Sequence, residues 1–403
     1  MANFILGTRG SLLAVTQSTI IANQLKSYYP QHHFTLKTIK TQGDVVTDKA
    51  LWQLEGKDFF TKELDDALNA KIVDFVVHSY KDLSTERPAQ IKLAAITTRK
   101  FAHDVLLIKS ETIRKIQKGT ITHINLGTSS PRRQFLLSQQ IKNFLPFGQK
   151  LQITCTNLRG NINTRIEKLR SGEFDIICLA FAGLERLANL EESYQKLETL
   201  LHDIEIKFLP LSIFPAAPAQ GALAIECLHS HEELAGILNK LHCTETAKEV
   251  GLERDLFKTY GGGCHLALGV FAKKQTNNSI FISALGQVDH KTINVCKMIP
   301  HPSFPNLVGN EPIFIGLTPQ RLKEHHLPEN YFSDEAKVIQ PLDTPHPQEI
   351  NTANFFISSE HCINTFNNYV PFDKPTLLWC SGTVVHQKLS ALGYWVHGDN
   401  DSM

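Results

Sequence analysis

The chain of 403 residues has almost no net charge, with 41 lysines and arginines against 40 aspartates and glutamates. Such a balance creates no overall field that would attract nucleic acid or an anionic membrane. Its apolar runs, such as Phe75–Val77 and Ile176–Ala180, are far shorter than a membrane span. We therefore expect no nucleic-acid or membrane partner, and any affinity for anions has to come from local clusters of cations.

Cysteine patterns that would indicate a disulfide framework or a metal site are also missing. The eight cysteines form no CxxC pair and show no metal-ligand spacing with histidine. The N-terminal residues lack the charged and apolar regions of a secretory signal. Reduced thiols in a cytoplasmic protein without a bound metal fit these absences best.

Short apolar segments alternate with amphipathic ones, which is typical of α/β architecture. Phe4–Gly7 and Val73–Val77 read as strands, and the first is followed by a predicted helix from about Ser11 to Tyr28. The proline-rich segment 214–218 predicts a crossover between units. From about residue 290 the periodicity weakens, and strand-like stretches at 355–358 and 376–379 predict a small additional α/β unit.

A capping-box pattern beginning at Thr246 predicts a helix that ends at Tyr260. Gly261 then falls where a left-handed residue commonly terminates a helix. Cys264 follows in the run YGGGCH, where the glycines leave room for a large group at the sulfur. A small buried hydrophobe is the alternative role. The preceding helix directs its negative end toward the thiol, so we expect a raised pKa for Cys264.

Several turns after predicted strands combine glycine, hydroxyl groups and arginine. The run GTRGS (7–11) and the run GTSSPRR (127–133) both lead into predicted helices, whose N-termini favour anions. Ser130 suits the N-cap and Pro131 the first helical position. Arg132 and Arg133 then oppose the helix dipole, a conflict that an acidic ligand would resolve. A solvated basic turn is the alternative.

Two further segments extend this cationic set. The run NLRGNINTR supplies Arg159 and Arg165, and GLER supplies Arg186. The run VHSYKD places Lys81 and Asp82 at the C-terminal end of a strand, where open α/β sheets bind ligands. Asp82 is the one carboxylate in this otherwise cationic set. It either forms an ordinary salt bridge or stabilises positive charge that develops on a substrate nitrogen.

Over roughly residues 3–300 the chain resembles the hydroxymethylbilane synthase (porphobilinogen deaminase) family. The segments that carry the resemblance, in the family's order, are GTRGSLLAVTQ, TQGD, GKDFFTKELDDAL, VHSYKDL, GTSSPRRQ, LRGNINTR, DIICLAFAGLERL, AQGALAIE and ERDLFKTYGGGC. The resemblance implies three α/β domains, of which the first two are similar to periplasmic binding proteins. We expect domain 1 at 1–99 and 205–227, domain 2 at 100–204, domain 3 at 228–300 and an extension at 301–403.

The resemblance also implies an activity. Four porphobilinogen molecules are condensed head to tail with loss of ammonia on a dipyrromethane cofactor attached to Cys264, and hydrolysis then releases hydroxymethylbilane. Asp82 matches the carboxylate that stabilises the cation formed when ammonia leaves. Lys57, Asp58 and Phe59 match a lid segment. The residues that match the family's anion-binding and polar contacts are Arg9, Ser11, Gln17, Lys81, Thr128, Ser129, Ser130, Arg132, Arg133, Arg159, Gly160, Arg165, Arg186, Gln220 and Gly221.

The chain departs from the family pattern at a few positions. Asp58 stands where the lid segment usually has glycine, which places a negative charge on a loop expected to close over an anion. Ala219 replaces the glycine of a GQG-type turn, and an insertion lies around residues 138–150. None of these departures removes an expected catalytic group.

Residues 306–403 resemble, over short stretches, the N-terminal part of uroporphyrinogen-III synthase. This makes that enzyme a candidate partner of an otherwise monomeric chain. Three readings therefore remain open: a deaminase with a structural or docking appendage, a bifunctional synthase–cyclase fusion, and a non-catalytic protein that binds small anions.

Overall fold

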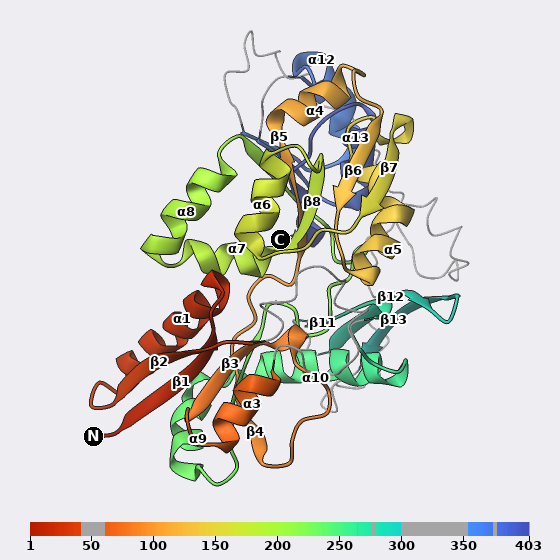
Figure 1. The fold of residues 1–403 in the computed structure, drawn as a ribbon. Coiled ribbons are helices and arrows are strands. Elements are labelled where there is room, and N and C mark those ends of the chain that lie inside the picture. Colours follow the sequence, from red (N-terminus) through yellow and green to blue (C-terminus); the bar gives the residue numbers. More distant parts are fainter. Residues whose placement is uncertain (42–60, 264, 276–278, 300–353, 374–376, 403) are drawn as a thin grey trace.

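The computed structural model describes residues 1–41, 61–263, 265–275, 279–299, 354–373 and 377–402. Strands and helices alternate along the chain and form four sheets with helices packed on them (Figure 1). The expected α/β class is confirmed. None of the helices in the described ranges has both the length and the apolarity needed to cross a membrane.

The first sheet has the strand order β2-β1-β3-β10-β4. Its strands are β1 (Asn3–Arg9), β2 (His33–Ile39), β3 (Phe75–Ser79), β4 (Ile91–Ile96) and β10 (Leu223–Leu228). Strand β1 runs parallel to β2 and β3, whereas β10 is antiparallel to β3 and β4. The helices of this unit are α1 (Leu12–Tyr28), α3 (Lys62–Asn69) and α9 (Glu232–Leu238). Alternate apolar residues of the strands meet α1 and α9 in one buried core.

The second sheet repeats this topology with the order β7-β6-β8-β5-β9. Strand β6 is parallel to β7 and β8, and β5 is antiparallel to β8 and β9. Its strands are β5 (Asp104–Lys109), β6 (His123–Gly127), β7 (Gln152–Thr156), β8 (Ile176–Ala180) and β9 (Ile204–Phe208). Its helices are α4 (Ser110–Gln117), α5 (Pro131–Gln140), α6 (Ile162–Arg170), α7 (Phe181–Ala188) and α8 (Glu191–Leu201), with short 3-10 turns η3 (Ile141–Phe144) and η4 (Gly148–Lys150).

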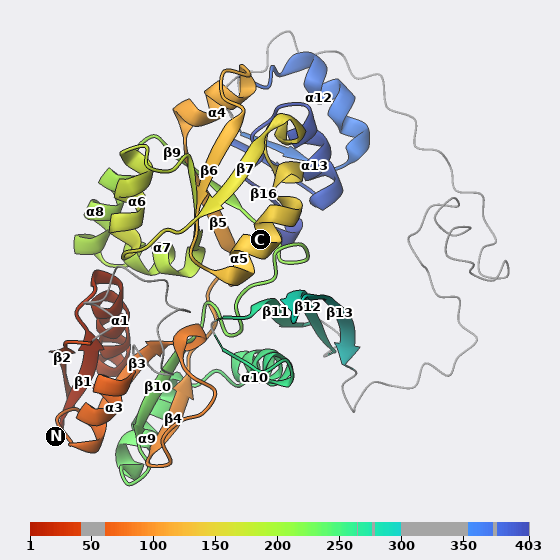
Figure 2. The same cartoon turned by 45° about the vertical axis from the view of Figure 1, so that its right-hand side comes forward.

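Two smaller sheets complete the described chain. The antiparallel strands β11 (Ala267–Lys274), β12 (Ile280–Val288) and β13 (Lys291–Ile299) pack on α10 (Thr244–Thr259). Near the C-terminus, β14 (Asn354–Ile357), β15 (Leu377–Cys380) and β16 (Gly398–Asp399) are parallel and pack with α12 (Ile363–Tyr369) and α13 (Thr383–Ala391). We call residues 354–373 and 377–402 the C-terminal extension; it lies against the second sheet unit (Figure 2). The remaining 3-10 turns are η2 (Tyr80–Asp82), η5 (Asn239–Leu241), η7 (Glu360–Cys362) and η8 (Asn400–Ser402).

Local sequence chemistry sets several helix ends as expected. Ser11 caps α1 by accepting a hydrogen bond from the Ala14 N–H, and Ser130 caps α5 ahead of Pro131. The predicted start of α10 at Thr246 is wrong, because the helix begins at Thr244. Its predicted end is confirmed: Tyr260 is the C-cap. Gly261 follows it with φ of 99°.

Two connectors join the first two sheet units: residues 97–103 between β4 and β5, and residues 209–222 between β9 and β10. An expected boundary at residue 205 would divide β9, which pairs with β5. The expected start of the third domain at 228 would separate α9 from the core of the first sheet, to which Leu234 and Leu238 belong. We therefore propose 1–99 with 209–241 as the first domain, 100–208 as the second, and 242–299 as the third.

Candidate active site

Lys81 and Asp82 lie in η2, directly after β3. Asp82 is exposed and Lys81 is half-buried. Burial lowers the pKa of Lys81 to about 8, while the negative charge of Asp82 acts in the opposite direction. The same two opposing influences act on Arg165 and Arg186, whose pKa values fall to about 10. Asp82 therefore lies within electrostatic reach of a cation beside it and of two cations from the second sheet unit.

Arg132 and Arg133 at the start of α5 share one buried carboxylate, Asp104 at the start of β5. Arg132 Nη2 lies 2.8 Å from Asp104 Oδ2, and Arg133 Nη2 lies 2.7 Å from Oδ1. Although burial opposes the charge on Asp104, the two guanidiniums hold the pKa of this carboxyl below its usual value. Burial also lowers the pKa of Arg132, whereas at Arg133 the attraction of Asp104 outweighs burial and the pKa rises.

This contact corrects two interpretations of the sequence. Asp82 is not the only carboxylate among the cations, and the placement of Arg132 and Arg133 at a helix N-terminus does not by itself require an acidic ligand. Asp104 already supplies one negative charge there. Its position at the start of the apolar strand DVLLIK was the available signal, but the sequence does not reveal a contact across the sheet.

The arginine pair is not fully satisfied by Asp104. Arg132 also donates to the Pro215 carbonyl at 2.8 Å, and Arg133 Nη1 donates to the Cys178 carbonyl at 3.2 Å. Arg133 Nε is buried without a hydrogen-bond acceptor among the described residues. A buried N–H with no partner is costly, so this atom is suited to receive an acceptor from a ligand.

Gln220 connects the groups of the first two sheet units. Its Nε2 donates to Asp104 Oδ1 at 2.9 Å, and its Oε1 accepts from Lys81 Nζ at 3.3 Å. The next residue, Gly221, has φ of 95°, and a Cβ there would lie 2.7 Å from the Lys100 carbonyl oxygen. The Gly221 carbonyl in turn accepts from Arg186 Nη2 at 2.7 Å. The turn at 219–221 therefore positions cations of both units.

The loop before α6 holds Arg159 and Gly160. Arg165 Nε donates to the Gly160 carbonyl at 2.8 Å, and Gly160 has φ of 112°. Burial lowers the pKa of Arg159 as well, and the charge of Arg159 lowers that of Arg165. Among the described residues, neither Arg165 nor Arg186 forms an ion pair with a carboxylate. The guanidiniums of these two residues therefore indicate a site for an anion.

The remaining polar candidates mainly shape the backbone around these cations. Ser129 Oγ donates to the Leu158 carbonyl at 2.7 Å, which ties the α5 turn to the loop before α6. Thr128 Oγ1 accepts from the Ser130 N–H at 3.3 Å. Gln17 on α1 forms a hydrogen bond with Ser79 at 3.2 Å, just before Lys81.

Arg9 ends β1 and Ser11 begins α1. The first turn of α1 reaches the second unit, because Leu12 and Leu13 pack against the core that contains α7. The start of α1 therefore lies at the junction of the two units (Figure 1). The lid residues Lys57, Asp58 and Phe59, and the attachment residue Cys264, lie outside the described residues.

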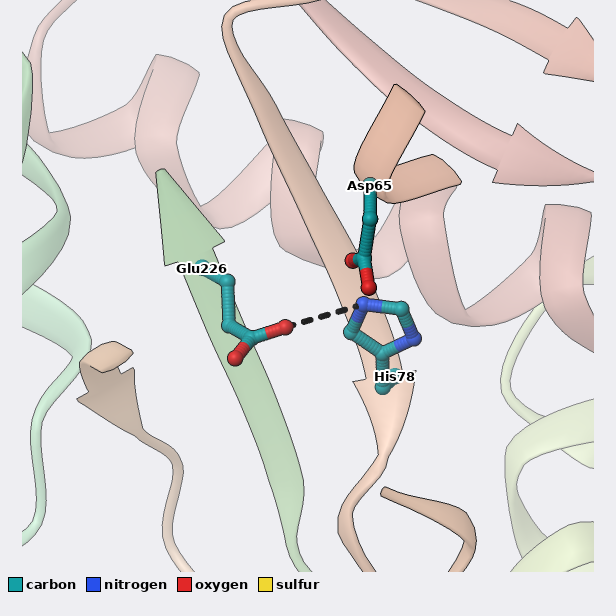
Figure 3. Close-up of side chains that lie close together, drawn as sticks. All are labelled: Asp65, His78 and Glu226. Atoms are coloured by element: carbon teal, nitrogen blue, oxygen red, sulfur yellow. Dashed lines mark ion pairs between the residues drawn. The ribbon is translucent and has the colours of Figure 1, made fainter. Parts of the chain in front are cut away.

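Beneath Lys81 and Asp82, a buried cluster of Asp65, His78 and Glu226 has the composition of a metal site (Figure 3). His78 Nε2 lies 3.3 Å from Glu226 Oε2. Arg87 Nη2, however, contacts Asp65 at 2.6 Å and Glu226 at 2.9 Å. The guanidinium already binds both carboxylates, so we interpret this cluster as a structural connection between α3, β3 and β10.

Two repeated α/β units with cations at their junction define a class: an α/β protein that binds an acidic small molecule between two domains. Residues 4–236 match the model of the family described as porphobilinogen deaminase, dipyromethane cofactor binding domain. The porphobilinogen deaminase of Brevibacillus brevis is 36% identical over 320 residues, 79% of this chain and 92% of that protein. That of Nitratiruptor sp. is 38% identical over 281 residues, 70% of this chain and 82% of that protein. The chain belongs to the porphobilinogen deaminase family.

Solved structures that match parts of the chain include the OxyR regulatory domain from Pseudomonas aeruginosa, at 14% identity and a TM-score of 0.29 over 60% of this chain and all of that one. A probable amino-acid ABC transporter binding protein from Bacillus subtilis also has 14% identity, with a TM-score of 0.32 over 59% of this chain and 89% of that one. Both scores are too low to assign a common fold.

Proposed function

We propose that this chain is a hydroxymethylbilane synthase, which condenses four porphobilinogen molecules into a linear tetrapyrrole on a dipyrromethane cofactor attached to Cys264. Family membership supports the reaction. The observation that carries the assignment to this site is the position of Asp82, an exposed carboxylate within reach of Lys81, Arg165 and Arg186. An exposed carboxylate beside these cations weakens the binding of anions, so its presence favours a role in stabilising positive charge that develops during a reaction.

The described residues fit the acidic side chains of a dipyrromethane. Arg133 offers a buried N–H without an acceptor among the described residues, and Arg165 and Arg186 offer guanidiniums that lack a carboxylate partner there. When bound, the dipyrromethane would supply the pyrrole carbon to which the first porphobilinogen unit is joined. The polypeptide provides fixed cations for acetate and propionate groups, and Asp82 would stabilise positive charge that develops on a nitrogen of the substrate.

Further roles follow for the other candidates. Arg9, Ser11, Lys81, Arg132 and Arg159 complete the binding surface for the growing polyanion. Thr128, Ser129, Ser130, Gly160, Gln17, Gln220 and Gly221 hold the backbone and the cations in place. We propose a cytoplasmic monomer that passes its product to a uroporphyrinogen-III synthase. The free state of each described cysteine supports a reducing compartment.

The test uses the purified full chain with porphobilinogen, following substrate consumption and ammonia release. Asp82→Asn is expected to lower kcat by about 10²- to 10³-fold, as for removal of one group that stabilises developing charge. Its matched control is Asp66→Asn, which neutralises an exposed carboxylate on α3 and should leave kcat unchanged.

Intact-mass measurement tests the attachment residue independently. The native chain should exceed its sequence mass by about two pyrrole units, and Cys264→Ser should carry no added mass. An unmodified native chain that consumes no porphobilinogen would show that the site only binds anions. Formation of the type III cyclic isomer by the chain alone would instead identify a synthase–cyclase fusion.

A further inference from the structure

The C-terminal extension is packed against the second sheet unit through backbone hydrogen bonds and ring contacts. The Phe208 N–H at the end of β9 donates to the His397 carbonyl at 2.7 Å, so the extension covers the edge of the sheet. The insertion at 138–150 faces the extension too. The Phe144 ring lies 4.9 Å from the His386 ring, and the Phe147 N–H donates to the Ser390 carbonyl at 2.9 Å.

A buried polar chain crosses this interface. Lys207 on β9 lies within hydrogen-bond distance of the Val396 carbonyl, and its Nζ is 3.1 Å from His386 Nε2. The other ring nitrogen of His386, Nδ1, is 3.0 Å from Asp399 Oδ2. All three side chains are fully buried. An ammonium can only donate and a carboxylate can only accept, so His386 accepts at Nε2 and donates at Nδ1.

This polar chain continues to the connectors between the first two sheet units. Asp399 Oδ1 accepts from the Asp401 N–H at 3.1 Å. Asp401 Oδ2 accepts from the Ser212 N–H at 2.8 Å, and the Asp401 carbonyl lies 3.1 Å from His103 Nε2. Ser212 lies in one connector and His103 in the other. One residue of the extension, Asp401, therefore contacts both connectors between the first two sheet units.

The connector contact is adjacent to the arginine pair. His103 precedes Asp104, which binds Arg132 and Arg133. The Asp104 carbonyl also accepts from the Leu209 N–H at 3.0 Å, which joins the two connectors at this point. A shift of His103 would therefore move the carboxylate that fixes both guanidiniums.

We propose that the C-terminal extension braces both connectors, and that Asp401 is a positioning residue that holds His103 and Ser212, and through His103 the Asp104–arginine group, in place. These contacts are sufficient to support the bracing role of the extension, whereas its effect on turnover rests on the proposed function. The extension then contributes to elongation of the tetrapyrrole chain without touching substrate.

The experiment compares the full chain with Asp401→Ala, Asp401→Asn and Glu360→Gln. Asp401→Ala removes the acceptor for the Ser212 N–H, whereas the amide oxygen of Asp401→Asn can replace it. Glu360→Gln is the matched control, since it breaks the exposed Glu360–Lys388 ion pair on the same extension. Hydrogen exchange of residues 97–104 and 209–222 is measured together with kcat and KM for porphobilinogen.

Asp401→Ala keeps the backbone carbonyl that contacts His103 but removes the acceptor of the Ser212 N–H. It should raise the exchange rate of residues 209–222, and that of residues 97–104 through the hydrogen bond between the Leu209 N–H and the Asp104 carbonyl. It should also lower kcat by roughly 3- to 30-fold, because a small displacement of binding groups is costly in rate. Asp401→Asn should restore both values, and Glu360→Gln should match the native chain. Exchange and kcat in Asp401→Ala equal to those of Glu360→Gln would overturn the proposal. Faster exchange with an unchanged kcat would overturn the positioning role. If the native chain has no deaminase activity, the proposed function fails, while hydrogen exchange still tests the brace.

Discussion

Replacing Asp104 with asparagine tests whether this carboxylate is the fixed counter-ion of the arginine pair. The new amide would keep the shape of the side chain and could still accept from Gln220, but it would leave Arg132 and Arg133 facing each other in a buried site. Each charge-assisted hydrogen bond is worth about 1.5–3 kcal/mol. Removing one partner of a buried ion pair costs about 3–5 kcal/mol, which we expect as the loss in free energy of unfolding.

The assay is urea unfolding at pH 7 followed by circular dichroism. Glu111→Gln serves as a control, because it breaks an exposed ion pair with Lys115 and should leave the free energy of unfolding nearly unchanged. A loss of less than about 1 kcal/mol in Asp104→Asn would refute the assignment of Asp104 as the counter-ion.

The pH dependence of the same variant provides a second criterion. Because the pKa of Asp104 is lowered in the folded state, its contribution is present above the unfolded value of about 3.9 and is lost as the pH falls toward the folded value. The difference between Asp104→Asn and the native chain should therefore be constant from about pH 5 to 7 and shrink below about pH 4. A difference that persists undiminished at about pH 3 would contradict this explanation.

Three further predictions concern other parts of the chain. The stability of the docked extension should rise between about pH 7 and 10. Burial lowers the pKa of Lys207 to about 7 in the folded protein, so in this pH range the unfolded chain binds more protons than the folded one. Lys207→Met should flatten this rise, measured by urea unfolding followed by the fluorescence of Trp379 and Trp395. The KM for porphobilinogen should increase as the pH passes about 8, where Lys81 loses its charge, and Lys81→Arg should remove that increase from the pH profile. Gly221→Ala should lower the free energy of unfolding by about 1–3 kcal/mol in a denaturant titration, because φ at this position is 95° and the new Cβ would meet the Lys100 carbonyl.

The sequence was most informative where a structural feature depends on neighbouring residues. The caps at Ser11 and Ser130 were predicted because a hydroxyl group and the N–H groups of the next turn suffice to form them. The capping box at Thr246 led to a wrong helix start, because the side chains of Thr246 and Glu249 bind other partners instead of capping the helix. The Thr246 hydroxyl accepts from the Arg99 N–H at 3.0 Å, and the Glu249 carboxylate accepts from the Lys274 N–H at 2.9 Å.

Contacts between distant segments could not be predicted in this way. Asp104 and Arg133 are 29 residues apart, and Lys207 and His386 are 179 apart. A lysine on an edge strand ordinarily faces water and discourages pairing with another sheet. Nothing in the composition of residues 204–208 shows that this lysine is covered by the extension.

The two carboxylates of the site, Asp104 and Asp82, show why the order of charged residues along the sequence does not by itself reveal the role of each residue. Asp104 is buried and its oxygens are occupied by Arg132, Arg133 and Gln220, so no substrate nitrogen can approach it. Asp82 is exposed, and it acts on Lys81, Arg165 and Arg186 through electrostatic attraction rather than through hydrogen bonds that would occupy its oxygens. A carboxylate that stabilises charge on a substrate has to remain accessible to it. Of the two, only Asp82 meets this condition, and Asp104 meets a different need by keeping two guanidiniums fixed before any acidic ligand arrives.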